Sequence, residues 1–266
     1  MIGIFDSGIG GLSVLSAIVL ALPQADLVYV ADTAHLPYGD KEDDFIRRRV
    51  LIIGRYLVEQ GCTVVVVACN TATAAAVAAF RDAFPDTPVV GVEPGVKPAA
   101  IASKSGHIAV LATPSTARSE RLARLIHRYA GNVQVSVEAC PGWATRVESL
   151  QHNDPNFAIE ASRHLMPLLD AGADQIVLGC THYAFLSPVL EEIVAGRAQL
   201  VDVAGAVARQ CVRIAKASNS SHSLRGKGQL TLLATAHPER LQAALPALGL
   251  NSMMPRLSAP ATRIAI

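Results

Sequence analysis

The sequence predicts an α/β protein made of two pseudo-symmetric lobes, each a doubly wound parallel sheet, with the active site between them. Short runs of β-branched residues alternate with longer helical stretches along the chain. These runs lack polar alternation, as in parallel sheets that helices cover on both faces. One pattern of strand and cysteine occurs twice, which indicates two related halves.

The predicted strands and helices follow one another in regular order. Strands are expected where β-branched residues cluster, at residues 2–5, 27–31, 64–68, 89–92, 108–111, 133–137, 176–179, 200–203 and 230–234. Between them the sequence has helical stretches, among them residues 43–60, 73–83, 120–129 and 155–171. This alternation is typical of a doubly wound architecture.

The internal repeat is the strongest sign of two lobes. Residues 57–70 read LVEQGCTVVVVACN, and residues 168–181 read LLDAGADQIVLGCT. Each segment has a glycine, a β-branched strand and a cysteine at the end of that strand. The spacing from glycine to cysteine is the same in both, from Gly61 to Cys69 and from Gly172 to Cys180. Small hydrogen-bonding residues follow each cysteine.

Breaks in the pattern suggest where the lobes begin and end. Two prolines and a glycine interrupt it near residues 93–98, and the chain is expected to return to the first lobe near residues 204–206. We therefore expect residues 1–95 and 206–266 in the first lobe and residues 96–205 in the second. Ligands of open parallel sheets bind beyond the carboxyl ends of the strands, where both cysteines are expected to lie.

Composition argues against a nucleic-acid or membrane partner. The chain has 266 residues, of which 51% are hydrophobic, and its formal net charge is +1, whereas nucleic-acid binding usually shows a basic domain. The mildly basic residues 216–227 are rich in Ser and Gly and are expected to form a solvated loop. The longest apolar run, residues 12–22, is too short to span a bilayer. The first residues are expected to be a strand rather than a targeting leader.

The cysteines suggest a reducing compartment. Their number is odd and their spacing is wide, which argues against a disulfide framework; they are Cys62, Cys69, Cys140, Cys180 and Cys211. Free thiols are most simply explained by a cytoplasmic location. Cys69 and Cys180 are the two expected at matching strand ends, and the other three are interpreted as packing residues.

A thiol at the end of a strand is suited to proton transfer. A thiolate is a base, and a helix N-terminus next to the sulfur favours the charged form. Cys69 is expected to precede such a helix, although a buried structural cysteine is the alternative. Next to the other thiol, His182 is interpreted as a proton relay or, when protonated, as a group that favours the thiolate; a packing histidine is the alternative.

A glycine-rich turn after the first strand is expected to bind a small carboxylate. The residues DSGIGG, from Asp6 to Gly11, offer backbone N–H groups but match neither a P-loop nor the dinucleotide fingerprint. Asp6 would repel an anion, so it is expected to face an ammonium group or to assist a thiol, with a helix N-cap as the alternative. No grouping has convincing metal-ligand spacing, and no lysine stands out as a Schiff-base former.

At this point the residues resemble a known family, the glutamate racemases of the aspartate/glutamate racemase superfamily. The resemblance runs in order from residue 3 to about residue 206. It rests on the segments GIFDSGIGGLSVL (3–15), YVADTAHLPYG (29–39), VACNTAT (67–73), GVEPGVKPA (91–99), LATPSTARS (111–119), ACPGWATRVE (139–148) and VLGCTHY (177–183). The C-terminal region carries little of it. The sequence departs from the family pattern at Ala184, where a proline is usual, and at Val203, where a serine is usual. Neither residue is a proposed proton carrier.

The resemblance implies racemisation of L- and D-glutamate without cofactor or metal, supplying D-glutamate for peptidoglycan. Members of the family often form homodimers, so a homodimer is one expectation. Cys69 and Cys180 would be the catalytic acid/base residues, and Asp6, Glu148 and His182 would tune them, with Asp6 beside Cys69 and His182 beside Cys180. Substrate contacts would come from Asp6, Ser7, Tyr38, Gly39, Asn70, Thr71, Thr113, Ser115, Thr116, Thr181 and His182.

The sequence alone leaves three rival functions open. The nearest is another member of the superfamily, such as an aspartate or hydantoin racemase or a maleate isomerase. A two-lobed amino-acid binding protein would share the cleft but would not need the thiols. A hydrolase would use Cys180 as a nucleophile together with His182.

Overall fold

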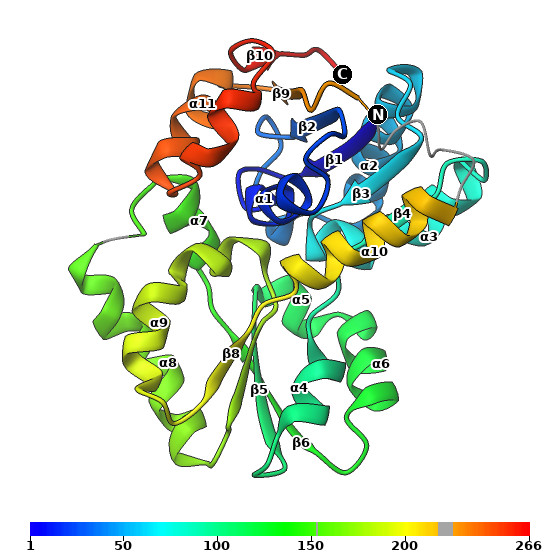
Figure 1. The fold of residues 1–266 in the computed structure, drawn as a ribbon. Coiled ribbons are helices and arrows are strands. Elements are labelled where there is room, and N and C mark those ends of the chain that lie inside the picture. The colour runs from blue at the N-terminus through cyan, green and yellow to red at the C-terminus, as the bar shows by residue number, and fades with distance from the viewer. Residues whose placement is uncertain (153, 218–225) are drawn as a thin grey trace. The chain divides into compact units, whose positions relative to one another are not determined.

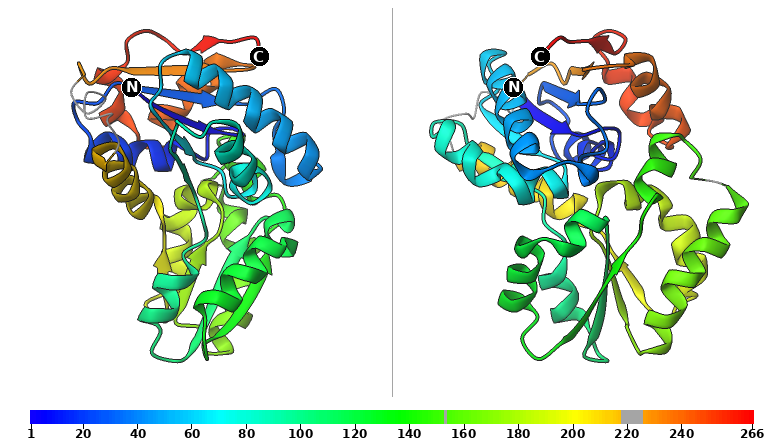
Figure 2. Two further views of the ribbon diagram at one scale, coloured as in Figure 1. Left: turned by 90° about the vertical axis from the view of Figure 1, so that its right-hand side faces the viewer. Right: turned by 180° about the vertical axis from the view of Figure 1, so that it is seen from behind.

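The computed structural model describes residues 1–152, 154–217 and 226–266, which form two compact units. The first unit contains Met1–Val92 and Ala204–Ile266, and the second contains Glu93–Val203. Most of the solvated loop expected at residues 216–227 lies outside the described residues. Figures 1 and 2 show the elements of each unit in three views.

The first unit is built on a six-stranded parallel sheet in the order β10-β9-β2-β1-β3-β4. Its strands are β1 (Ile2–Asp6), β2 (Leu27–Ala31), β3 (Val64–Val67), β4 (Val89–Gly91), β9 (Leu230–Ala234) and β10 (Thr262–Arg263). The central strands β1, β2 and β3 are buried along their whole length, which explains why their sequences are continuous apolar runs.

Helices cover both faces of this sheet. One face packs against α2 (Asp43–Glu59) and α3 (Asn70–Ala83) through a core rich in valine. On the other side, α1 (Leu12–Ala21) and α10 (Ala204–Ala217) pack against each other. The C-terminal segment adds α11 (Pro238–Ala247) next to β9, and the short helices η1 (Tyr38–Asp40) and η4 (Asn251–Arg256) complete the unit.

The second unit has a four-stranded parallel sheet in the order β6-β5-β7-β8. Its strands are β5 (His107–Ala112), β6 (Gln134–Ala139), β7 (Gln175–Leu178) and β8 (Gln199–Val201). Helices α4 and α6 lie on one face of the sheet and α8 and α9 on the other (Figures 1 and 2). The helices of this unit are α4 (Val96–Ala102), α5 (Pro114–Arg118), α6 (Glu120–Tyr129), α7 (Trp143–Glu148), α8 (Pro155–Asp170), η2 (Thr181–Leu186) and α9 (Ser187–Val194).

The two sheets share one strand order. The first four strands are arranged as β2-β1-β3-β4, and the next four repeat this arrangement as β6-β5-β7-β8. The α/β class with two parallel sheets is therefore as predicted, and the internal repeat has a structural counterpart. The order 2-1-3-4 also creates a topological switch point between the first and third strands, where open α/β sheets bind ligands.

The repeat extends to single backbone hydrogen bonds. The N–H of Ala68 donates to the carbonyl of Phe5 at 2.7 Å, and the N–H of Gly179 donates to the carbonyl of Leu111 at 2.7 Å. Each bond continues the pairing of the first and third strands one residue beyond the last paired position. Since a cysteine follows at once in both units, the two thiols occupy matching places on their sheets.

The glycines of the repeat explain how the chain enters the third strand. Gly61 and Gly172 both have positive φ, of 83° and 93°, a conformation that other residues adopt only with strain. The N–H of Gly61 donates to Val58 and that of Gly172 to Leu169, as at the left-handed end of a helix. The equal spacing from glycine to cysteine therefore reflects one helix end, one turn and one strand used twice.

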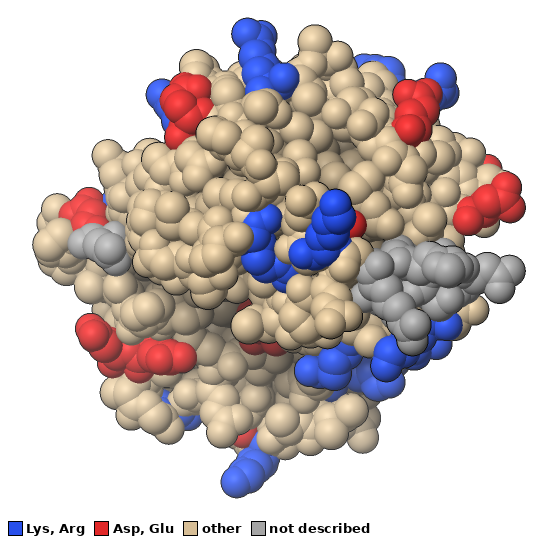
Figure 3. All heavy atoms as spheres, turned by 45° about the horizontal axis from the view of Figure 1, so that its top comes forward, with Lys and Arg blue, Asp and Glu red and all other residues tan. Residues whose placement is uncertain are grey.

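No helix of the described residues is long and apolar enough to cross a membrane. On the face drawn in Figure 3, separate groups of acidic and of basic side chains lie among wide areas of other residues. This distribution agrees with the near-zero net charge of the sequence.

Gly179 should tolerate no larger residue, because a Cβ there would lie 2.6 Å from the backbone oxygen of Leu111. We expect Gly179→Ala to lower the free energy of unfolding by about 1–3 kcal/mol, as overpacking does. Gly205→Ala is the matched control, since its nearest neighbour would be the Arg209 side chain at 3.5 Å. Urea denaturation followed by circular dichroism measures both, and equal stability of Gly179→Ala and the parent chain would contradict the packing argument.

Candidate active site

Cys69 lies at the start of helix α3 in the first unit, where it is the N-cap residue. Its sulfur accepts a hydrogen bond from the backbone N–H of Ala72 at 3.5 Å, and the residue is 6% exposed. The partial positive charge of a helix N-terminus favours negative charge on such a sulfur. The helix begins at Asn70, so the predicted placement of a helix directly after this thiol is confirmed, a few residues earlier than expected.

The start of α3 is held in place by Thr73. Its hydroxyl donates to the carbonyl of Val67 at 3.2 Å and accepts from the N–H of Val92 at 3.1 Å. These bonds link α3 to the ends of β3 and β4. They fix the helix end against the sheet, and with it the position of Cys69.

The glycine-rich turn after β1 places Asp6 and Ser7 beside this thiol. The Asp6 carboxylate is fully buried and accepts hydrogen bonds from the backbone N–H groups of Ser7, at 2.7 Å, and of Gly11. The hydroxyl of Ser7 lies 3.3 Å from Asp6 Oδ1 and 3.9 Å from Cys69 Sγ. Gly11, rather than Asp6, is the N-cap residue of α1, so the alternative interpretation of Asp6 as a cap is wrong.

Asn70 has a side chain suited to holding a ligand. It is buried, and neither its amide nitrogen nor its amide oxygen has a hydrogen-bond partner among the described residues. Buried amide groups are nearly always hydrogen-bonded. An unpartnered amide next to Cys69 is therefore expected to pair with a polar group of a bound molecule. Thr71, which follows it in the first turn of α3, is also buried.

Tyr38 and Gly39 lie in η1, and the Tyr38 hydroxyl points to a carboxylate that sequence reasoning missed. It donates to Asp32 Oδ2 at 2.6 Å. Burial, followed by the charge of Asp32, raises the pKa of Tyr38 far above its ordinary value. Tyr38 therefore stays protonated and keeps this bond, while the half-buried Gly39 lies next to it in the chain.

Asp32 is the centre of a buried network that joins three parts of the first unit. Arg49 of α2 donates to it from Nε at 2.9 Å and from Nη2 at 3.0 Å, and the hydroxyl of Thr235 donates to it at 2.9 Å. Burial by itself would raise the pKa of Asp32, but the bonds from Arg49, Tyr38 and His35 hold it below its ordinary value. Asp32 is thus a buried carboxylate held in its charged form.

Cys180 is the N-cap residue of η2 in the second unit, with the same extended backbone conformation as Cys69. It is 8% exposed, and its Sγ lies 3.5 Å from Nδ1 of His182. The other ring nitrogen of His182, Nε2, lies 2.6 Å from Oε1 of Glu148. Thiol, imidazole and carboxylate thus form one chain of contacts, in which Glu148 reaches the histidine from α7.

The electrostatics of His182 follow from this chain. Burial by itself would lower the pKa of His182, but the hydrogen bond and charge of Cys180, followed by those of Glu148, raise it well above its ordinary value. An imidazolium between the two acids would stabilise a thiolate on Cys180. The predicted pairing of His182 with this thiol is present in the structure.

The remaining predicted residues of the second unit lie on the turns after β5 and β7. Thr113 is the N-cap of α5, and its oxygen accepts from the N–H of Thr116 at 3.3 Å and lies 3.1 Å from the Thr116 hydroxyl. Ser115, between them, is half-buried. Thr181 is the first residue of η2 and is buried. Thr113 follows β5 at the place that corresponds to Ser7 after β1.

The other three cysteines differ from this pair. Burial raises the pKa of Cys62 to about 11 and that of Cys211 to about 12. Burial and the charge of Glu138 also raise the pKa of Cys140. Thiols of this kind stay neutral, which agrees with their interpretation as packing residues.

The structure thus brings the predicted residues together in two groups, one in each unit. The first group is Asp6, Ser7, Tyr38, Gly39, Cys69, Asn70 and Thr71, and the second is Thr113, Ser115, Thr116, Glu148, Cys180, Thr181 and His182. Each group lies on the turns that follow the first three strands of its sheet. Sequence reasoning missed Asp32 and Arg49; a charged residue directly after a buried strand is the signal that could have found Asp32, whereas Arg49 lies within α2.

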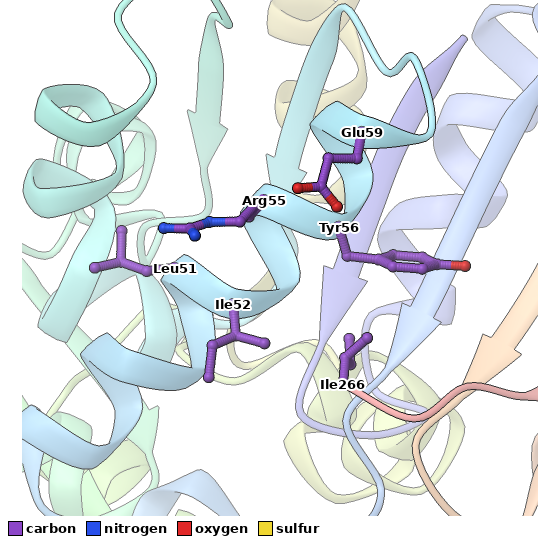
Figure 4. A pocket seen from close by; sticks show the side chains of 6 residues that line it. All are labelled: Leu51, Ile52, Arg55, Tyr56, Glu59 and Ile266. Atoms are coloured by element: carbon purple, nitrogen blue, oxygen red, sulfur yellow. The ribbon is translucent and has the colours of Figure 1, made fainter.

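Two further features do not belong to these groups. Among the described residues, no cluster of three or more His, Cys, Asp or Glu side chains is arranged to hold a metal ion. A shallow pocket of about 340 Å³ lies along α2 (Figure 4). It contains neither thiol and is lined by Leu51, Ile52, Arg55, Tyr56, Glu59 and Ile266.

Comparison with known proteins places the chain among racemases. The family model described as Asp/Glu/Hydantoin racemase matches residues 4–211. A glutamate racemase of Pseudomonas aeruginosa is 44% identical over 250 residues, which cover 93% of this chain and 93% of that protein.

Solved structures of glutamate racemases have the same fold. The Escherichia coli enzyme, in complex with L-glutamate and the activator UDP-MurNAc-ala, has a TM-score of 0.86 and 30% identity over 99% of this chain and 97% of its own. The Thermus thermophilus enzyme, in complex with beta-chloro-D-alanine, has a TM-score of 0.80 and 32% identity over 100% of this chain and 96% of its own.

Glu148→Gln should lower the pKa of His182, because the charge that Nε2 faces is lost. In the folded chain the pKa of His182 is raised above its ordinary value of about 6.5. Protonated His182 therefore stabilises the folded state fully below about pH 6.5, and this stabilisation is lost as the pH rises through the raised pKa. In Glu148→Gln this loss should begin at a lower pH. An NMR titration of the His182 ring and urea unfolding over a pH series measure the two effects.

The control for this prediction is Glu192→Gln, which removes an exposed carboxylate from α9 of the same unit. It should leave the titration of His182 unchanged. An unchanged pKa of His182 in Glu148→Gln would show that the carboxylate does not act on the ring.

Proposed function

The chain belongs to the Asp/Glu/Hydantoin racemase family, and we propose that it racemises glutamate by moving the Cα proton between Cys69 and Cys180 without a cofactor. The relatives confirm the predicted family and the isomerase class. The observation that carries the mechanism is the matching position of the two thiols, each one residue beyond the last backbone hydrogen bond between the first and third strands. The reaction supplies D-glutamate for peptidoglycan.

Two thiols on opposite faces of Cα are what inversion requires. One begins as a thiolate and removes the Cα proton, and the other begins as a thiol and delivers a proton to the opposite face. The substrate therefore need not turn over, and the two sulfurs exchange protonation states in each turnover. The reverse reaction uses the same groups with their roles exchanged.

The first half of the mechanism uses the start of α3 and the turn after β1. The Ala72 N–H and the helix N-terminus favour the Cys69 thiolate. The Ser7 hydroxyl lies between Asp6 and this sulfur, so Asp6 acts on the thiol through Ser7 or faces the substrate ammonium group. Both roles fit a carboxylate that is buried and fixed by backbone N–H groups.

The second half uses the imidazole. His182 contacts the Cys180 sulfur and holds positive charge beside it, and Glu148 stabilises that charge from the other ring nitrogen. Proton removal by Cys180 is then assisted by an ion pair inside the protein. Each thiol thus lies next to a group that favours its negative charge, a helix N-terminus at Cys69 and an imidazole at Cys180.

Substrate binding falls to neutral donors at the same turns. The Cα–H of an amino acid is a very weak acid, so the site must also stabilise charge that moves onto the carboxylate. Asn70, Thr71 and Thr181 can donate hydrogen bonds without the cost of burying another charge. The unpartnered amide of Asn70 supports this role. Because the Tyr38 hydroxyl is directed to Asp32, Tyr38 and Gly39 contribute through their backbone.

Further contacts, location and assembly belong to the same proposal. Thr113, Ser115 and Thr116 bind the substrate from the turn after β5. We place the chain in the cytoplasm, a location that five free buried thiols support. We also propose that the chain forms a homodimer.

Cys69→Ser and Cys180→Ser should each lower kcat for glutamate by about 10²- to 10⁴-fold, because a hydroxyl is a far weaker acid than a thiol and so does not supply the anionic base. Cys62→Ser is the control, since it makes the same change at a buried thiol outside both groups. Circular dichroism detection of the two enantiomers measures the rates. Parent-like rates for both variants would exclude the two-thiol mechanism.

Incubation in D₂O should place deuterium at Cα whichever enantiomer of glutamate is supplied, because each thiol exchanges its proton with solvent between turnovers. Aspartate assayed alongside should react much more slowly if glutamate is the substrate. Mass spectrometry with chiral chromatography follows both. Rapid racemisation with full retention of the Cα hydrogen would contradict the mechanism, and faster turnover of aspartate would reassign the substrate.

A further inference from the structure

Glu148 reaches His182 from the end of a very short helix. Helix α7 has six residues, and Glu148 is the last of them. A helix of this length has little stability of its own, so packing against other elements must fix its position. The contacts of α7 therefore decide whether Glu148 meets the imidazole.

Trp143, the first residue of α7, packs the helix against the segment that carries His182. Its indole is fully buried and meets the ring of Tyr183 at 5.4 Å and the ring of Phe157 at 5.1 Å, both edge to face. Tyr183 follows His182 directly in η2. The two ends of the Glu148–His182 contact thus share one aromatic cluster.

Arg146, one turn further along α7, fastens the helix to the start of α8. Its Nη1 donates to Asp154 Oδ2 at 2.8 Å and its Nη2 donates to Glu160 Oε2 at 3.0 Å. Its guanidinium also lies 5.4 Å from the ring centre of Phe157. A planar guanidinium that donates to two carboxylates fixes both the distance and the orientation of α7 relative to α8. A lysine at this position would not fix the orientation.

Glu160 is a partner of both Trp143 and Arg146. Its Oε1 accepts from the indole N–H of Trp143 at 3.1 Å, and its Oε2 accepts from Arg146. The Arg146 side chain is 21% exposed, and its two partners are more exposed still. Ion pairs of this kind contribute little to stability. Their main effect here is on where α7 lies.

We infer that Arg146 is a positioning residue, which fixes α7 to Glu160 of α8 and to Asp154, the N-cap of α8, and thereby holds Glu148 against His182. The inference rests on the proposed function, because it assigns Arg146 an effect on the Cys180 half of racemisation. Arg146 itself touches neither the imidazole nor a thiol in any contact that the structure shows. Misplacement by about 1 Å of a group in a catalytic chain costs about 10²-fold in rate.

The test compares Arg146→Gln with Arg146→Lys and with a control, Arg197→Gln. Arg197 forms an exposed ion pair with Asp170 at 2.7 Å, in the same unit but at the other end of α8. Arg146→Gln should lower kcat for glutamate by about 10- to 100-fold with little change in KM, since Arg146 does not bind the substrate. Arg146→Lys should recover part of this loss, and Arg197→Gln should match the parent chain.

Two further measurements separate positioning from a general loss of stability. In an NMR titration of the full chain, Arg146→Gln should shift the pKa of His182 in the same direction as Glu148→Gln. In a double-mutant cycle, Arg146→Gln should cause little further loss of kcat when Glu148 is already Gln, because both changes break one contact. Additive losses in the cycle, or an unchanged titration of His182, would overturn the inference.

The titration also keeps this test distinct from the test of function. If the parent chain failed to racemise glutamate, the proposed function would be wrong, but the effect of Arg146→Gln on His182 would still show whether Arg146 positions Glu148. If the parent chain racemised glutamate and Arg146→Gln retained its kcat, the positioning role would be wrong and the function would stand.

Discussion

The pairing of the first strand with the third is the constraint on which each of the two groups of candidate site residues depends. The bonds from Ala68 to Phe5 and from Gly179 to Leu111 bring the end of the third strand beside the turn that follows the first. A cysteine placed next in the chain must then lie at the switch point of its sheet. The sheet thus sets the position of each sulfur. Helix α3 in the first unit and His182 in the second then lie next to that sulfur.

The two units support charge on that sulfur in different ways. The first uses the N–H groups of a fourteen-residue helix, which carry partial charges and need no partner. The second has a 3-10 helix after its cysteine, with no side-chain cap bond to the sulfur, and uses an imidazole and a carboxylate instead. A buried ion pair is expensive unless its geometry is good. The contacts of Trp143 and Arg146, which set the position of α7, meet that requirement.

Sequence patterns predicted the parts of this architecture that are local. The β-branched run Val64–Val67 and the glycine before it determine a strand and its entry turn within a few residues, so the repeat was visible. The strand order that the two sheets share could not be predicted from the sequence, because it depends on pairings between distant segments. The Asp32–Arg49 pair was missed for the same reason, since the two residues are 17 positions apart and lie on a loop and a helix. Likewise, the family motif suggested Glu148, but only the fold shows that it meets His182.

The C-terminal segment, which carries little family signal in its sequence, has a structural role in the first unit. Thr235 follows β9 and donates to Asp32, and its own oxygen accepts from the N–H of Ala34 at 2.9 Å. Arg49 extends the same network to the carbonyl of Ile266 at 3.2 Å. Since Asp32 also holds the Tyr38 hydroxyl, the end of the chain completes the hydrogen bonding of the carboxylate that fixes the Tyr38–Gly39 turn. Each unit thus uses a carboxylate, an arginine and an aromatic residue, taken from different elements, to hold a short helix after its second strand.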